Sequence, residues 1–296
     1  MIGHLRIKSP WAQLGVFLAV FSPQLILLLI SLGEDTVQPD LSKPGAIQMF
    51  KWLQAASSLT FFLLPAFLYA VFTFRGRYFY FLGFKKADKA NMYILGIFCM
   101  LMAFPLVFWL GELNQRIPLP QSLVNMENDT AKDIEAFLKI NSPIDILVNI
   151  LVIALFPAIC EEMLFRGALQ RIIIHLTRSP WTGIIISAAL FSALHFQFLG
   201  FLPRMLLGII LGAMFWYSGS LWTSIIAHFV TNAVQVLAAS YAPKLINENP
   251  TLPVYLALIS GLAVFFLLLL FHKQSTITWS KVYERDNISP GNQFIA

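Results

Sequence analysis

Long apolar runs alternate with short polar segments along the whole chain. A run of about 17–25 apolar residues has the length of a membrane-spanning helix, and the alternation predicts an all-α bundle of about eight such helices, a polytopic membrane protein. The pattern shows no internal repeat, so we expect a single membrane domain over residues 1–296. The predicted spans cover roughly residues 11–32, 51–74, 92–112, 145–168, 180–197, 203–218, 221–240 and 254–272.

The composition agrees with a chain surrounded by lipid. Hydrophobic residues make up 58% of the chain and charged residues only 12%, whereas about 25% of the residues of a soluble domain are charged. The N-terminus has a basic start followed by an apolar run that resembles a signal peptide. That run continues to about Leu32 without a small-residue cleavage site, so we expect it to be retained as the first span.

The net charge of +5 does not indicate a nucleic-acid partner, because the basic residues lie scattered at the ends of the predicted spans. They instead predict the orientation of the chain, since cytoplasmic loops carry an excess of Lys and Arg. The densest basic cluster lies between the second and third spans. Placing this cluster in the cytoplasm puts both termini in the cytoplasm as well. Its members are Arg75, Arg77, Lys85, Lys86 and Lys89.

The predicted outer loop 113–144 is acidic and contains one helical pattern, "DTAKDIEAFLKI". Asp129 is a candidate for its N-cap, and Ile134, Phe137 and Leu138 fall on one face. The segment is either a short helix that lies on the outer membrane surface or an ordinary loop helix.

Three predicted spans contain polar residues that a lipid-facing helix does not need. An ionisable side chain within a span costs on the order of 2.5–3.5 kcal/mol on insertion scales. Each of these residues alone has a structural explanation, as an ion pair, a polar packing residue or a contact between helices. Their occurrence in three spans together favours a functional site. They are Glu161, Glu162 and Arg166 in the fourth span, His195 in the fifth, and His228 and Asn232 in the seventh.

The spacing of these residues indicates how they face. Glu162 and Arg166 are four residues apart, so they share a helix face and can pair, whereas Glu161 is rotated by about 100° and can meet another helix. His228 and Asn232 are also four residues apart. A carboxylate and an imidazole can accept a proton or hold a metal, and a second imidazole and an amide can donate hydrogen bonds to an oxyanion. The set therefore predicts a pocket that activates water.

Other reactive motifs are missing from the sequence. Cys99 and Cys160 form neither a disulfide framework nor a CxxC metal site. The sequence contains no HExxH zinc motif and no GxSxG nucleophile motif, and nothing around Ser192 indicates a serine nucleophile. Gly208 and Gly212 form a GxxxG pattern, which predicts close helix packing.

Three motifs occur in order along the later spans. "EEMLFRG" (161–167) fits EExxxR, "FSALH" (191–195) fits FxxxH, and "HFVTN" (228–232) fits HxxxN. Over roughly residues 145–240 the chain thereby resembles the CPBP family, the CAAX-type and bacteriocin-processing intramembrane endopeptidases, also called the Abi family. The resemblance implies a hydrolase whose catalytic core is this stretch, and we expect it in a bacterial cytoplasmic membrane.

The resemblance also implies roles for the polar residues. Glu161 and His195 would activate the hydrolytic water, His228 and Asn232 would stabilise the oxyanion, and Glu162 and Arg166 would support the site. The family is classed as metallopeptidases, so a divalent metal such as zinc is one expectation, with Glu161, His195 and His228 as its ligands. A metal-free water activated by glutamate is the other, because a catalytic zinc usually has three protein ligands.

The resemblance leaves the substrate open, beyond a membrane-associated protein or peptide. Eukaryotic members trim prenylated CAAX tails, and bacterial members are linked to bacteriocin processing or immunity. A non-catalytic membrane scaffold or bacteriocin-immunity protein of the same family is therefore an alternative. A proton-coupled transporter is a third reading, but it predicts repeat symmetry that the sequence lacks.

Overall fold

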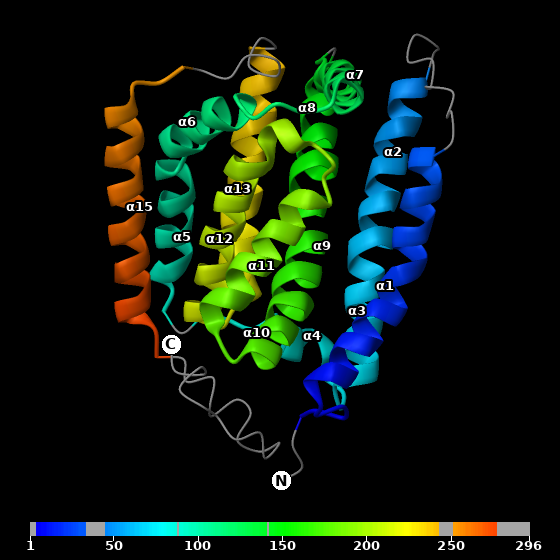
Figure 1. Ribbon diagram of the computed structural model, residues 1–296, viewed down its shortest axis with the longest axis vertical. Coiled ribbons are helices and arrows are strands. Elements are labelled where there is room, and N and C mark those ends of the chain that lie inside the picture. Colours follow the sequence, from blue (N-terminus) through cyan, green and yellow to red (C-terminus); the bar gives the residue numbers. More distant parts are fainter. Residues whose placement is uncertain (1–3, 34–44, 88, 141, 243–250, 277–296) are drawn as a thin grey trace.

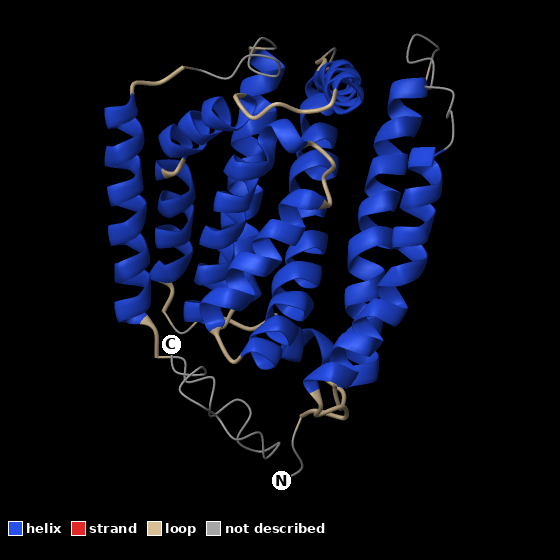
Figure 2. Cartoon of the chain, viewed as in Figure 1, coloured by secondary structure: helices blue, strands red, loops and turns tan. Residues whose placement is uncertain are grey.

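The computed structural model describes residues 4–33, 45–87, 89–140, 142–242 and 251–276. Within these ranges the regular elements are helices, and one isolated bridge joins Leu5 to Phe74 (Figure 2). In the part of the chain that the structure describes, seven helices are long and apolar enough to cross a membrane. The predicted all-α polytopic membrane bundle is confirmed.

The helices of residues 10–73 lie at one edge of the bundle and the helix of residues 254–274 lies at the opposite edge, while the helices of residues 143–241 lie between them (Figure 1). The first half of the chain contains α1 Pro10–Gly33, α2 Ala46–Ser58, η1 Leu59–Leu63, α3 Leu64–Thr73, α4 Tyr78–Leu82, α5 Asn91–Met102, α6 Phe104–Gln115 and α7 Gln121–Leu138. The second half contains α8 Pro143–Asn149, η2 Ile150–Leu155, α9 Phe156–Glu162, η3 Met163–Gln170, α10 Arg171–Thr177, α11 Pro180–Ala193, η4 Phe198–Gly200, α12 Phe201–Ser218, α13 Leu221–Tyr241 and α15 Val254–Gln274.

Some successive elements join end to end into single long helices. Residues Pro143–Thr177, from α8 to α10, form one span of 35 residues, so the predicted span 145–168 continues nine residues further than expected. Helices α11 and α12 pack against each other beside this long helix (Figure 1). Helix α13 packs against the N-terminal half of the long helix, formed by η2 and α9. The start of α1 and the end of α15 lie at the same end of the bundle (Figure 1).

The predicted span 180–197 is shorter than expected. Helix α11 begins at Pro180, where the Ser179 hydroxyl accepts a hydrogen bond from the Thr182 amide, and it ends at Ala193 after 14 residues. At about 1.5 Å per residue it is about 21 Å long, against a hydrocarbon core of about 30 Å. The described residues therefore form seven full-length spans and one short apolar helix where eight spans were predicted.

Two of the long helices widen into π-helical turns just before a proline. The π-helical segment η1 precedes Pro65, and η2 precedes Pro157. Proline lacks an amide hydrogen and its ring clashes with the carbonyl four residues earlier, and a π-turn relieves both constraints by changing the hydrogen-bond register. The third π-helical segment, η3, has no proline after it and carries the motif residue Arg166.

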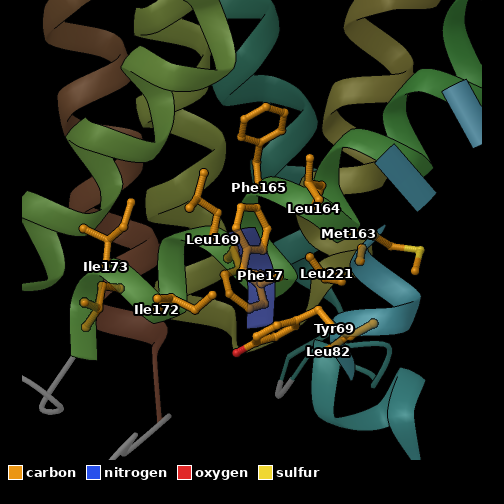
Figure 3. Packing of buried hydrophobic residues seen from close by; sticks show 14 of the residues in the cluster. Phe17, Tyr69, Leu82, Met163, Leu164, Phe165, Leu169, Ile172, Ile173 and Leu221 are labelled. Carbon is orange, nitrogen blue, oxygen red and sulfur yellow. The ribbon is translucent and has the colours of Figure 1, made fainter. Parts of the chain in front are cut away.

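The largest buried apolar cluster surrounds η3 and α10 and reaches α1, α3 and α12 (Figure 3). The GxxxG pair brings α12 close to this centre, as predicted. An added Cβ at Gly208 would lie 3.0 Å from the Cβ of Ala188, and one at Gly212 would lie 2.7 Å from Oε1 of Gln170. A larger residue at Gly208 would meet the backbone of α11 and push α12 outward, and one at Gly212 would displace the side chain of Gln170.

The predicted outer-loop helix exists, but its predicted start is wrong. Helix α7 begins at Gln121, directly after Pro120, and Asp129 lies inside it, where its carboxylate is 2.8 Å from the Lys132 amine. Proline fixes a φ angle that suits the start of a helix, so Pro120 and not Asp129 marks where α7 begins. The apolar face packs on the protein, since Phe137 is buried and its ring lies 4.9 Å from that of Phe50 on α2.

Candidate active site

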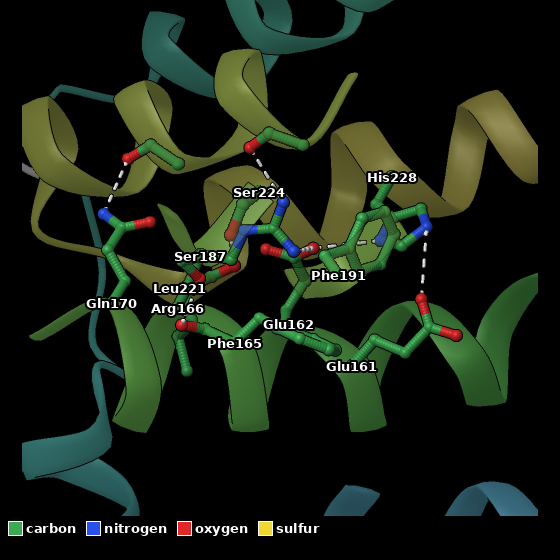
Figure 4. Close-up of polar contacts among 12 residues, drawn as sticks. Glu161, Glu162, Phe165, Arg166, Gln170, Ser187, Phe191, Leu221, Ser224 and His228 are labelled. Atoms are coloured by element: carbon green, nitrogen blue, oxygen red, sulfur yellow. Dashed lines mark hydrogen bonds and ion pairs between the residues drawn. The ribbon is translucent and has the colours of Figure 1, made fainter. Parts of the chain in front are cut away.

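The predicted ion pair lies in the buried centre of the long helix, at the junction of α9 and η3 (Figure 4). Nη1 of Arg166 is 2.8 Å from Oε1 of Glu162, and the two side chains are 1% and 0% exposed. Their spacing of four residues placed them on one face, as expected. Such a pair is secure only when further contacts satisfy both groups, because burying two charges is costly.

Arg166 obtains those contacts from two other helices. Its Nη2 donates to the carbonyl of Gly208 on α12 at 2.9 Å, and its guanidinium lies 4.9 Å from the ring centre of Phe191 on α11. One turn later, Nε2 of Gln170 donates to the carbonyl of Gly212 at 3.0 Å (Figure 4). Two side chains spaced by four residues on η3 thus bind two carbonyls spaced by four residues on α12.

His228 joins the first motif to the third. Its Nδ1 is 3.0 Å from Oε1 of Glu162, and its Nε2 is 3.8 Å from Oε2 of Glu161 (Figure 4). A carboxylate oxygen only accepts, so Nδ1 carries the proton of this hydrogen bond. The distance from Nε2 to Glu161 is too long for a direct hydrogen bond. Glu161 and Glu162 therefore face the same imidazole from two directions. The rotation of about 100° between them predicted that Glu161 could meet another helix, but not that both carboxylates would face one histidine.

His195 lies in the loop that follows α11. Its Nδ1 is 2.8 Å from the carbonyl of Phe191, which makes Nδ1 the donor and Nε2 the acceptor in a neutral ring. The ring of Phe191 lies edge-on to both imidazoles, with ring centres 4.9 Å from His195 and 6.0 Å from His228. The first residue of the second motif thereby contacts both histidines.

The remaining predicted residues have simpler surroundings. Asn232 follows His228 by one turn on α13 and is half-buried. Ser192 is buried, and its hydroxyl donates to the carbonyl of Phe201 at 2.7 Å, so it holds the start of α12 in place. These contacts agree with the absence of a serine nucleophile motif.

Two residues of the site were not predicted. Gln170 extends the face of Glu162 and Arg166 by one more turn, so the same four-residue rule could have identified it. Arg204 in the first turn of α12 interacts electrostatically with Glu161 and donates to the side chain of Gln197 at 2.9 Å. The sequence carries no local signal for Arg204, because its partners become neighbours only through the tertiary fold.

The donor set does not fit a zinc site with three protein ligands. Of the three expected ligands, Glu161 and His228 lie together. The hydrogen bond from Nδ1 of His195 to a backbone carbonyl leaves Nε2 of that ring free, so it is the grouping of the side chains that speaks against a three-ligand site. Among the residues that the structure describes, no three His, Cys, Asp or Glu side chains form a group that could hold a metal ion. We therefore derive no catalytic step through a metal.

Comparison with known proteins gives a family for the centre of the chain. Residues 143–234 match the model of the family described as "Type II CAAX prenyl endopeptidase Rce1-like", and this segment contains the six predicted site residues. "Uncharacterized protein YpbD" of Bacillus subtilis (strain 168) is 37% identical over 90 residues, which are 29% of this chain and 43% of that protein. The match thus covers less than half of that relative. No solved structure matches the chain. The resemblance drawn from the three motifs is confirmed.

Proposed function

We propose that this chain, whose residues 143–234 carry an Rce1-like domain, is an intramembrane endopeptidase. It hydrolyses a peptide bond in a membrane-associated protein or peptide. The observation that carries the proposal is the position of His228, which contacts Glu162 through Nδ1 and faces Glu161 with Nε2. A buried helix junction gains nothing in packing from two adjacent carboxylates and an imidazole, whereas water activation needs such groups.

The hydrolytic water would lie between Glu161 and His228. Oε2 of Glu161 and Nε2 of His228 are 3.8 Å apart, a separation that one water can bridge. Glu161 takes a proton from this water, and the water oxygen bonds to the carbonyl carbon of the substrate. His195 offers the lone pair of Nε2 as a second acceptor for a hydrogen of the water.

The tetrahedral intermediate needs donors for its negative oxygen. Asn232 supplies amide hydrogens, and His228 donates from Nε2 when its ring is protonated. Glu161 then returns the proton to the amide nitrogen of the substrate, the carbon–nitrogen bond breaks, and a carboxylic acid and an amine leave. The roles of these residues follow the family resemblance, and the contacts of His228 support them.

Glu162 and Arg166 would hold this arrangement without touching substrate. Glu162 accepts the Nδ1 hydrogen of His228 and thereby sets both the tautomer and the orientation of the ring. Arg166 neutralises Glu162 and ties it to Gly208 and Phe191. The nearest of these groups to the Glu161 carboxylate is Nε2 of His228 at 3.8 Å. This distance is too long for a direct hydrogen bond, so the carboxylate is available to the water.

The test is Glu161→Gln, which keeps the volume but removes the proton acceptor. We expect turnover to fall by about 10²–10⁴-fold, the usual contribution of general-base catalysis, with the melting temperature unchanged or higher because a buried charge is removed. Purified protein in liposomes would be given a peptide library, and cleavage would be followed by mass spectrometry. Glu135→Gln, an exposed carboxylate on α7, is the matched control.

Either of two results would contradict this assignment. A Glu161→Gln protein that cleaves as fast as Glu135→Gln shows that Glu161 is not the base. A wild-type protein that cleaves no peptide in the library, while folding normally, favours a non-catalytic scaffold or immunity protein of the same family.

The metal question has its own measurement. The donor set lacks a third protein ligand, so we expect a strong chelator to leave turnover within about twofold of its starting value and the melting temperature unchanged. Loss of turnover that added zinc restores, together with a metal content near one ion per chain, would instead support a metal held by Glu161 and His228.

A further inference from the structure

The loop that carries His195 is held in an unusual backbone conformation. It leaves α11 at Leu194 and enters η4 at Phe198, and Phe196 between them has a φ of 53°. This left-handed conformation is unfavourable for a bulky residue. It persists only where the surrounding structure holds it in place.

Helix α7 provides one of the restraints. Oε1 of Glu127 accepts hydrogen bonds from the amides of Phe198 at 2.6 Å and Leu199 at 3.1 Å, and Oε2 lies 3.2 Å from the same Leu199 amide. One carboxylate thus binds two successive backbone amides at the start of η4. Hydrogen bonds to a charged acceptor are shorter and stronger than neutral ones.

Two further side chains restrain the same loop. Asn114 of α6 donates to the carbonyl of Phe198 and accepts from the amide of Leu202, both at 2.7 Å. Arg204 donates to the carbonyl of Gln197 at 3.1 Å. Side chains of α6, α7 and α12 therefore hydrogen-bond to the backbone around His195. Of these three side chains, Glu127 is the one that does not belong to a candidate membrane span.

We infer that Glu127 is a positioning residue for His195. Glu127 holds the backbone at Phe198, three residues beyond His195. Because Glu127 is part of α7, the position of α7 against the loop controls where Nε2 of His195 points. This inference rests on the proposed function, in which His195 faces the hydrolytic water. It adds a residue that lies outside the three motifs and outside the segment 143–234 matched by the family.

The experiment compares Glu127→Ala and Glu127→Gln with Asp129→Asn. Asp129 is the matched control, because it lies two residues away on α7, is exposed, and has its carboxylate 2.8 Å from the Lys132 amine. Hydrogen exchange of the peptide 194–202 measures the loop directly and needs no substrate. Steady-state cleavage measures its effect on the site.

We expect faster exchange of residues 194–202 in Glu127→Ala, unchanged exchange in the centre of α12, and a fall in kcat of about 10–10²-fold with KM changed by less than about twofold, the loss typical of a misplaced catalytic group. Glu127→Gln keeps one acceptor oxygen, so its kcat should lie between those of the wild type and Glu127→Ala. This variant also serves if Glu127→Ala folds poorly.

Two outcomes overturn the inference: unchanged exchange in both Glu127 variants, or faster exchange with a kcat equal to that of Asp129→Asn. If the wild-type protein cleaves nothing, the proposed function fails instead. The exchange data then still decide whether Glu127 holds the loop.

Discussion

At the scale of single residues, the site depends on one carboxylate that serves two partners. Oε1 of Glu162 lies 2.8 Å from Arg166 and 3.0 Å from His228, so the charge that neutralises the arginine also orients the histidine. Removing Arg166 leaves the charge of Glu162 buried without compensation, which costs far more than the ion pair contributes as a whole. Stability and activity are therefore coupled at Glu162.

The chain contains its own comparison for this coupling. Glu112 and Arg116 have the same four-residue spacing and lie 2.6 Å apart, but the Arg116 side chain is 70% exposed, against 1% for Arg166. We expect Arg166→Ala to destabilise the protein by about 3–5 kcal/mol and Arg116→Ala by about 0–1 kcal/mol. Thermal unfolding in detergent and the yield of folded protein would measure both. Equal losses of stability in the two variants would show that burial of the Glu162–Arg166 pair does not determine its contribution to folding.

The residue contacts divide into those that spacing predicts and those that it does not. The pairing of Glu162 with Arg166 follows from the period of the helix, and so does the shared face of His228 and Asn232. The contact of Arg166 with the carbonyl of Gly208 joins residues 42 positions apart. No local pattern encodes it, because it depends on how α12 packs against η3.

At the scale of the elements, η3 and α12 are joined by backbone contacts that glycine permits. Arg166 and Gln170 bind the carbonyls of Gly208 and Gly212, and both contacts require α12 to approach closely. The GxxxG pattern predicted close packing, but the polar side chains that use it could not be inferred from the pattern alone.

Substituting the glycines tests this contact. In Gly208→Ala the new methyl group would lie 3.0 Å from the Cβ and 3.2 Å from the Cα of Ala188, so the backbones must move apart. We expect a loss of about 1–3 kcal/mol, typical of overpacking, and a fall in turnover as the Gly208 carbonyl moves away from Arg166. Gly261→Ala on α15 is the control, because its methyl group would meet only Leu106, at 3.6 Å. Melting temperatures that fall equally in both variants would refute the role of close packing.

The positions of the spans were predictable, but their internal geometry was not. Apolar runs located most of the helices to within a few residues, because burying apolar side chains in lipid dominates their placement. The long helix Pro143–Thr177 is an exception, since it continues nine residues beyond its predicted end. The end of α11 was misplaced because Leu194 and Phe196 are apolar yet leave the helix, in a loop held by distant Glu127 and Asn114. The π-helical segment η3 had no proline after it and no other sequence signal.

At the scale of the whole molecule, the two ends of the described chain lie on the same side of the bundle (Figure 1). This arrangement requires α11 to count as a crossing despite its length. The basic cluster around Arg75, Arg77 and Lys85 lies at that same end, between α3 and α5, where the bundle is expected to face the cytoplasm.

Reporter fusions in a bacterial host test this orientation. Fusions after residues 83, 178 and 276 should report the cytoplasmic side, and a fusion after residue 128 in α7 should report the opposite side. A reporter after residue 276 that lies opposite to the one after 83 would mean an odd number of crossings between them. That result would contradict both the bundle and the predicted cytoplasmic location of the termini.

The shortness of α11 has a consequence for the lipid around the molecule. Trp181, Ile185, Ile186 and Leu190 on this helix are exposed, so in a bilayer they contact acyl chains. A hydrophobic segment shorter than the hydrocarbon core is accommodated by local thinning of the bilayer. Thinning beside α11 lowers the headgroups toward its end at Ala193, where the loop with His195 begins. We expect this thinning to bring the aqueous boundary closer to the proposed site and to make its supply of water depend on acyl-chain length.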